Sequence, residues 1–183
     1  NRSIAQAQAA VEFIGAGQPY LLHDMAALPP ADYWLIACPD DHLSFCSEAL
    51  VKSGVIQATA IVFHCSGALT ADAALASVKQ AGASIASIHP IKSFAQPALA
   101  VQNFAGTFCG VEGDDIALAE LLPLFTAIGA HCFGIQASAK TLYHAASVIA
   151  CNYLVALQEL ALQTYAQAGV ERSQALAILK PIV

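Results

Sequence analysis

Short apolar runs alternate with segments of helical spacing along the first 136 residues. The apolar runs predict strands at Asp32–Pro39, from near Thr59, and at Ser84–Ile88, Phe104–Val111 and His131–Ile135, the first of them buried. Helical spacing predicts helices at Ser3–Ile14, Asp40–Lys52, Ala71–Ala81 and Asp114–Ile128, the last interrupted early by Pro123. Strands that alternate with helices of about ten to fifteen residues are typical of βαβ units and a parallel sheet.

The pattern changes after Ile135. Residues 137–168 form one long segment of helical spacing without glycine or proline, and Gly169 is expected to end it. A segment of this length predicts a second, all-helical region. The sequence therefore predicts an α/β domain over residues 1–136 and the start of a helical domain over residues 137–183.

Part of the long helix is apolar enough to raise the question of a membrane span. The stretch Thr141–Gln158 carries no formal charge. It contains His144, Ser147 and Asn152, however, and charged residues stand on both sides of it. Polar side chains are costly in a bilayer, so the pattern favours a buried helix of a helical domain.

Composition indicates a partner subunit and argues against nucleic acid. With 57% hydrophobic and 11% charged residues, the chain has little charge to cover an isolated surface, which predicts a homodimer. A net charge of −6 with 7 Lys and Arg gives no basic patch for phosphates. The six cysteines form no CxxC pair and the N-terminal segment does not read as a signal peptide, so we expect reduced thiols in a cytoplasmic protein.

Reactive polar groups follow two of the predicted strands. His64-Cys65-Ser66-Gly67 ends one strand, and His89-Pro90-Ile91-Lys92-Ser93 ends the next. An open parallel sheet binds its ligand beyond the carboxyl ends of its strands. These groups are therefore candidates for lining a cleft, although each histidine taken singly is more often a core or loop residue.

The long helix carries a second set of candidates. At roughly 100° per residue, one stripe collects Lys140, Tyr143, His144, Ser147 and Cys151, with Asn152 at its edge. Polar groups on an apolar helix need partners. The partner could be a substrate, or the groups could be satisfied in a helix–helix interface with Lys140 reaching water.

Five segments together resemble a known group of proteins: Asp32–Asp41, Phe63–Leu69, Ser87–Phe94, Gly106–Gly113 and Lys140–Ser147. They are similar to Rossmann-like oxidoreductases that join an NADP-binding domain to a C-terminal helical domain of unknown function. These belong to the wider 6-phosphogluconate, 3-hydroxyisobutyrate and prephenate dehydrogenase-like group. The resemblance implies that residues 1–136 are a dinucleotide-binding domain, and that residues 137–183 begin a domain for dimerisation and substrate binding. A first strand, a glycine-rich turn and a second strand would precede Asn1 in such a protein.

The resemblance also implies a cofactor site for NADP. Asn-Arg-Ser after the second strand of such proteins holds the 2′-phosphate, and this chain starts with Asn1-Arg2-Ser3. A guanidinium pairs two phosphate oxygens at once, and a helix N-terminus adds a favourable dipole. The other residues expected to bind the cofactor are Cys38, Pro39, His64 and Ser66.

The catalytic assignments come from the same resemblance. Hydroxyisobutyrate-type dehydrogenases carry a catalytic Lys followed four residues later by an Asn; Lys140 matches the Lys, and His144 stands at the Asn position. His89-Pro90 resembles the His-Pro of prephenate dehydrogenase-like proteins. The expected catalytic residues are thus Lys140, His144 and His89, and the expected substrate-binding residues are Lys92, Ser93, Ser147 and Asn152.

Three functions follow from these residues. The first is an NADP-dependent oxidoreductase that transfers a hydride between nicotinamide and a small hydroxy, keto or imino acid. The second is a non-catalytic nucleotide-binding sensor or regulatory protein, and the third is a structural dimer module. No metal is expected, because the histidines and Cys65 show no ligand spacing.

Overall fold

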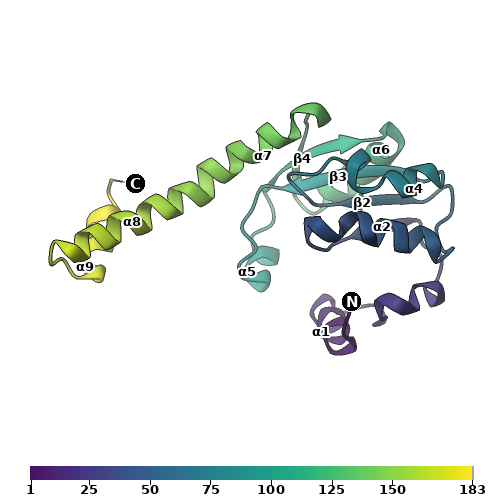
Figure 1. Cartoon of the computed structure of the whole chain (residues 1–183), viewed down its shortest axis with the longest axis horizontal. Coiled ribbons are helices and arrows are strands. Elements are labelled where there is room, and N and C mark those ends of the chain that lie inside the picture. Colours follow the sequence, from purple (N-terminus) through teal and green to yellow (C-terminus); the bar gives the residue numbers. More distant parts are fainter. Residues whose placement is uncertain (183) are drawn as a thin grey trace. The chain divides into compact units, whose positions relative to one another are not determined.

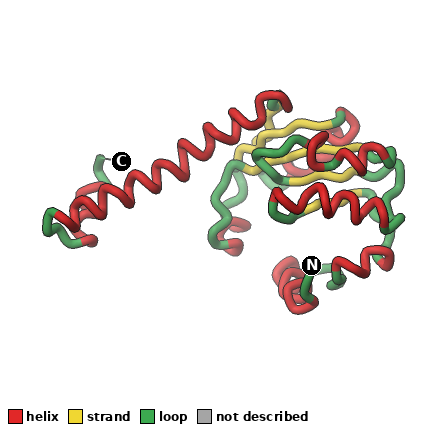
Figure 2. Tube along the Cα trace, viewed as in Figure 1, coloured by secondary structure: helices red, strands yellow, loops and turns green. Residues whose placement is uncertain are grey.

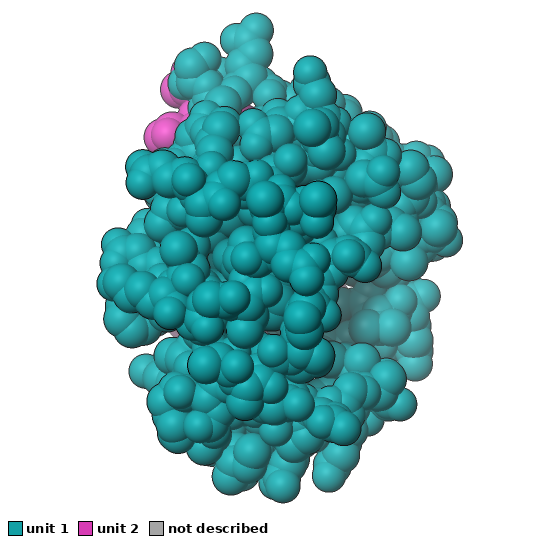
Figure 3. All heavy atoms as spheres, turned by 90° about the vertical axis from the view of Figure 1, so that its right-hand side faces the viewer, with its two compact units in different colours: residues 1–140 teal, residues 141–183 magenta. Residues whose placement is uncertain are grey.

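The computed structural model describes residues 1–182, which form two compact units. The first runs from Asn1 to Lys140 and the second begins at Thr141 (Figure 3). The first unit holds the sheet and the helices beside it, and the described part of the second consists of helices and the turn between them (Figures 1 and 2).

Five strands make one sheet in the order β1-β2-β3-β4-β5. They are β1 (Tyr33–Ile36), β2 (Ile61–His64), β3 (Ser84–Pro90), β4 (Phe108–Gly113) and β5 (His131–Gly134). The pairs β1–β2, β2–β3 and β4–β5 are parallel, which confirms the Rossmann-like α/β class. The pair β3–β4 is antiparallel, against the expectation of a parallel sheet. Residues 91–107, which include the six-residue helix α5 (Pro97–Gln102), connect these two strands. This segment is long enough for a parallel crossover, so the direction of β4 depends on the path of the segment and not on its length.

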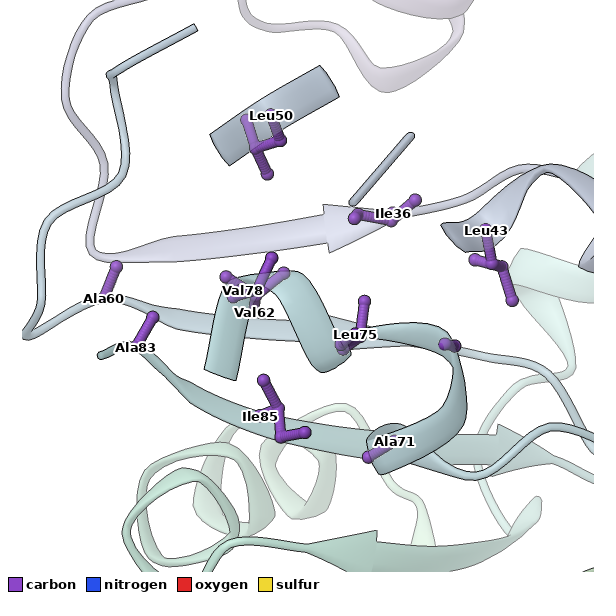
Figure 4. Packing of buried hydrophobic residues seen from close by; sticks show 11 residues of the cluster. Ile36, Leu43, Leu50, Ala60, Val62, Ala71, Leu75, Val78, Ala83 and Ile85 are labelled. Atoms are coloured by element: carbon purple, nitrogen blue, oxygen red, sulfur yellow. The ribbon is translucent and has the colours of Figure 1, made fainter. Parts of the chain in front are cut away.

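The two faces of the sheet carry separate cores because side chains alternate along each strand. Val62 and Ile85 pack on one face against α2 (Leu43–Lys52), α3 (Ala71–Ala74) and α4 (Ala76–Gln80) (Figure 4). Phe63 and Ile88 pack on the other face against α6 (Asp115–Ala127). Phe63 also meets Phe125 edge-on, with ring centroids 6.0 Å apart.

Three elements differ from the sequence prediction. The helix expected at Ala71–Ala81 is broken at Leu75, whose φ of −118° and ψ of 22° are not helical. Pro123 does not interrupt α6, because the packing of Ala117 and Leu121 on the sheet compensates for one lost backbone bond. Strand β1 is not buried: it lies at the edge of the sheet, and Leu35 is 51% exposed.

The N-terminal helix α1 (Ile4–Ile14) forms as its pattern predicts. Gly15 ends it with a φ of 78°, where its N–H donates to the carbonyl of Val11. Ser3 stands at the N-cap with extended backbone, but its hydroxyl makes no capping bond. A short 3₁₀ helix, η1 (Leu22–Ala27), follows before β1.

The long helix forms with the predicted length. The 3₁₀ turn η3 (Ala137–Ala139), α7 (Lys140–Val148), the π-helical turn η4 (Ile149–Tyr153) and α8 (Leu154–Gln167) are continuous. After Gly169, α9 (Arg172–Leu179) pairs with α8 through two hydrogen bonds from Arg172 to Glu159.

The expectation of a buried helix is wrong for the described chain. By length and composition the helix Ala137–Gln167 could cross a membrane, which alone is weak evidence, and only 6% of its most apolar window is buried. Among the described residues of the second unit, the one other helix is too short to cover such an apolar surface.

Candidate active site

Three polar residues stand side by side on one face of the sheet, within its apolar strands. The strand register pairs His64 with Ser87, and Ser87 with Glu112. Ser87 lies two residues after Ile85, so the row faces the same side as α2 to α4. His64 and Ser87 are 0% exposed and Glu112 is 7% exposed.

Lys140, the first residue of α7, reaches this row. Its Nζ donates to Ser87 Oγ and, at 2.8 Å, to Glu112 Oε1, and its side chain is 1% exposed. The backbone N–H of Ala71 at the start of α3 donates to the same carboxylate oxygen, at 2.9 Å. Burial lowers the pKa of Lys140, while the hydrogen bond and charge of Glu112 act in the opposite direction.

His64 is held as a neutral base beside the ammonium. Its Nδ1 accepts a hydrogen bond of 3.1 Å from the backbone N–H of Ser66. Burial, and secondarily the charge of Lys140, lower the pKa of His64 to about 4. Burial likewise raises the pKa of the Cys65 thiol to about 11, so neither residue carries a charge at neutral pH.

The Ser66 hydroxyl organises the loop after β2. Its Oγ donates to Asp40 Oδ2 at 2.7 Å and accepts from the backbone N–H groups of Ala68 and Leu69, at 3.1 and 3.0 Å. These bonds turn the loop toward α3 and fix its distance from the 3₁₀ turn η2 (Asp40–His42).

A cavity of about 660 Å³ opens at the carboxyl end of β1. Four of the residues expected to bind the cofactor line it: Asn1, Arg2, Cys38 and Pro39. Trp34 and Phe45 add aromatic surface. Ser3, His64 and Ser66 do not line this cavity, so the predicted cofactor residues fall in two places: the cavity with the adjoining start of α1, and the loop at the end of β2.

The residues around Arg2 make the adjoining part of the cavity suitable for binding an anion. Within residues 1–182, no hydrogen bond or ion pair engages the Arg2 guanidinium. No acidic residue occupies the first turn of α1, directly after Arg2. An unpaired guanidinium beside a helix N-terminus is a suitable phosphate site.

The remaining predicted residues are dispersed. His89 is half-buried near the end of β3, and Lys92 donates to the carbonyl of Asn103 at 2.8 Å, while Ser93 is exposed. The second unit holds three more, of which Asn152 is exposed and Ser147 donates to the carbonyl of Tyr143 at 3.4 Å. His144 is half-buried there.

The C-terminal part of the chain matches one protein-family model. Residues 107–183 match the Domain of unknown function DUF2520. No curated protein matches the sequence.

Solved structures resemble most of the chain. Protein TM1727 from Thermotoga maritima is 28% identical with a TM-score of 0.71, covering 97% of this chain and 64% of that protein. The predicted NADP oxidoreductase BF3122 from Bacteroides fragilis is 15% identical with a TM-score of 0.73, covering 99% and 66%. Prephenate dehydrogenase from A. aeolicus, solved with hydroxyphenyl propionate and NAD+, is 11% identical with a TM-score of 0.59, covering 76% and 50%.

The resemblance inferred from the sequence is confirmed. The chain shares the fold of Rossmann-like proteins that include a predicted NADP oxidoreductase, and its residues 107–183, which contain β4, α6 and β5 as well as the helical unit, match DUF2520. It spans 64% of TM1727 and 66% of BF3122, so part of each of those proteins has no counterpart in it.

Sequence reasoning missed three residues of the polar cluster: Ser87, Glu112 and Asp40. A signal was present for two of them, since a polar side chain in each of two apolar strands requires a buried partner. The sequence did not identify Lys140 as that partner, because Lys140 lies 53 residues from Ser87 and 28 residues from Glu112 along the chain.

Proposed function

We propose that the protein is an NADP-dependent oxidoreductase that transfers a hydride between nicotinamide and a small hydroxy, keto or imino acid. One observation carries this proposal: the cavity at the carboxyl end of β1 collects Asn1, Arg2, Cys38 and Pro39. An open α/β sheet binds its ligand at such a strand end.

The cavity residues suggest how a dinucleotide would be held. Arg2 would pair with the 2′-phosphate of NADP, since its guanidinium has no other partner within residues 1–182. Trp34 and Phe45 offer apolar surface to a base or ribose. The nicotinamide would supply or accept the hydride.

The buried cluster suggests a source for the proton. When a carbonyl or imine gains a hydride at carbon, its oxygen or nitrogen needs a proton, and the Lys140 ammonium can donate one and become a neutral amine. A pKa lowered by burial suits an acid that works near neutral pH. Because Lys140 is 1% exposed, a substrate would reach it only after the cluster opens.

Binding titrations of the complete protein test the cofactor assignment. We expect NADPH to bind more tightly than NADH. Arg2→Ala should raise the dissociation constant of NADPH by about 10- to 100-fold and leave that of NADH unchanged. Arg172→Ala is the matched control, because this arginine pairs with Glu159 in the second unit. If neither NADPH nor NADH bound to the protein, the proposal would be rejected.

The burial of Lys140 favours one alternative, a nucleotide-binding sensor without turnover. Such a protein would show the same NADPH preference but would oxidise no hydroxy, keto or imino acid in a substrate screen. An enzyme should turn over, and Lys140→Ala should lower kcat by about two to four orders of magnitude.

A homodimer in the cytoplasm completes the proposal. The second unit exposes a run of large apolar side chains with no charge from residue 141 to 158. These are Leu142, Ile149, Tyr153, Leu154, Val155 and Leu157. An apolar face of this kind is typical of an interface between subunits, and a second copy of the helix would cover it.

A further inference from the structure

Glu112 occupies the centre of the buried cluster. One carboxylate oxygen, Oε1, accepts from both the Lys140 ammonium and the Ala71 backbone N–H, at 2.8 and 2.9 Å. The N–H of Ala71 holds the carboxylate in place independently of Lys140. The position of the carboxylate is therefore set by β4 and by the start of α3, without a contribution from Lys140.

Several other groups affect the charge of Lys140, and they act unequally. Glu112 supplies both a direct hydrogen bond and the largest opposite charge, while the charge of Asp40 also favours the ammonium form of Lys140. Neutral His64 adds no charge to the cluster. Ser87 accepts a hydrogen bond but carries no charge. Glu112 is thus the only direct ionic partner that Lys140 has within the described residues.

We propose that Glu112 is a positioning residue for Lys140: its carboxylate fixes the ammonium against Ser87 and maintains its charge inside the protein. This inference rests on the proposed function, in which Lys140 donates the proton. A buried lysine without an anion would lose its proton more easily and would have nothing to donate. Glu112 touches neither substrate nor cofactor in this role and acts only through Lys140.

The titration of Lys140 tests the inference without any substrate. The chain has five lysines, so selective ¹³C and ¹⁵N labelling of lysine gives a spectrum in which Lys140→Met identifies one signal. Following that signal from about pH 6 to about pH 11 gives its midpoint of deprotonation. In Glu112→Gln we expect a lower midpoint than in the wild type, because the amide keeps the shape and removes the charge.

Glu120→Gln is the control, since Glu120 is an exposed carboxylate that accepts from Tyr33 Oη. It should leave the Lys140 midpoint unchanged. An equal midpoint in wild type and Glu112→Gln would overturn the inference. A wild-type Lys140 that titrates at the same pH as the other four lysines would also overturn the inference.

A measurement on the wild type covers the case in which Glu112→Gln does not fold. A spectrum of couplings across hydrogen bonds should connect Lys140 Nζ to the carboxyl carbon of Glu112. A visible ammonium signal without that correlation would contradict the proposed pairing. Both spectra are recorded without a dinucleotide, so they can support the pairing of Glu112 with Lys140 even if no dinucleotide binds. Rejection of the proposed function and rejection of this inference are therefore distinguishable.

If the enzyme assignment holds, kcat gives a third readout. The fall of kcat with rising pH should move to lower pH in Glu112→Gln, because the acid is lost earlier. A uniform fall in kcat at all pH values would indicate damage to the fold and would count against a positioning role.

Discussion

Glu112 Oε1 and Lys140 Nζ lie 2.8 Å apart, with side chains that are 7% and 1% exposed, although 28 residues separate them in the sequence. The pair joins β4 to the first residue of α7. Taking two charges out of water is costly, and the hydrogen bonds from Ala71 and to Ser87 offset part of that cost.

Breaking the pair on one side should destabilise the protein strongly. Lys140→Met leaves the Glu112 carboxylate buried without its cation, and we expect a loss of about 3–5 kcal/mol in the free energy of unfolding. The double variant Lys140→Met with Glu112→Gln should recover part of that loss, because the uncompensated charge is gone. Urea denaturation of the three variants measures this. Strict additivity of the two single changes would contradict a coupled pair.

Gly113 should not tolerate a side chain next to Glu112. Its φ is 144°, and a Cβ there would lie 2.5 Å from the carbonyl oxygen of Ile85 and 2.6 Å from the Cα of Ala86. Gly54→Ala is the matched control, with a φ of 75° and no atom within 4 Å of the added carbon. We expect Gly113→Ala to lose about 1–3 kcal/mol more than the control in thermal or urea unfolding. Equal losses would mean that β3 and β4 separate easily at this point.

His64 should make stability depend on pH in a defined window. Its pKa is about 4 in the folded chain and 6.5 ordinarily, so the unfolded chain takes up a proton first. The folded state therefore loses stability as the pH falls from about 6.5 to about 4, by at most about 3 kcal/mol, and gains nothing above 6.5.

The variant His64→Asn isolates this effect. Asparagine can still accept from the Ser66 N–H but does not titrate, so the difference in unfolding free energy between wild type and variant should change across that window. His23→Asn, at a site 75% exposed, is the control. A difference that is constant with pH would show that His64 is protonated as easily in the folded protein as in the unfolded one.

The apolar face of the second unit should hold two copies of the chain together. Leu157 is 64% exposed in α8, and Leu157→Glu places a charge in the proposed interface. Light scattering should give a dimer for the wild type and a monomer for the variant. Ile14→Glu, at a position 70% exposed in α1, should remain dimeric. A wild type that is monomeric at all accessible concentrations would remove the homodimer from the proposal.

Local patterns predicted most of the elements because each depends on neighbours in sequence. The alternation of apolar runs with helical spacing placed all five strands and α1, α2 and α6 near their observed positions. The uninterrupted spacing from residue 137 predicted the long helix, and Gly169 ends it with a φ of 81°. The unpredicted antiparallel β3–β4 pair depends on the path of a connecting segment, which no local pattern records.

The sequence by itself determined that polar groups follow the ends of two apolar strands and that Lys140 lies near the start of a long apolar helix. Only the tertiary structure decided which of them meet. His64, Ser87 and Glu112 become neighbours through strand register, and Lys140 joins them from a segment far along the chain. A buried charge needs a specific partner within hydrogen-bond distance, and that partner is chosen by how strands and helices pack rather than by spacing along the chain.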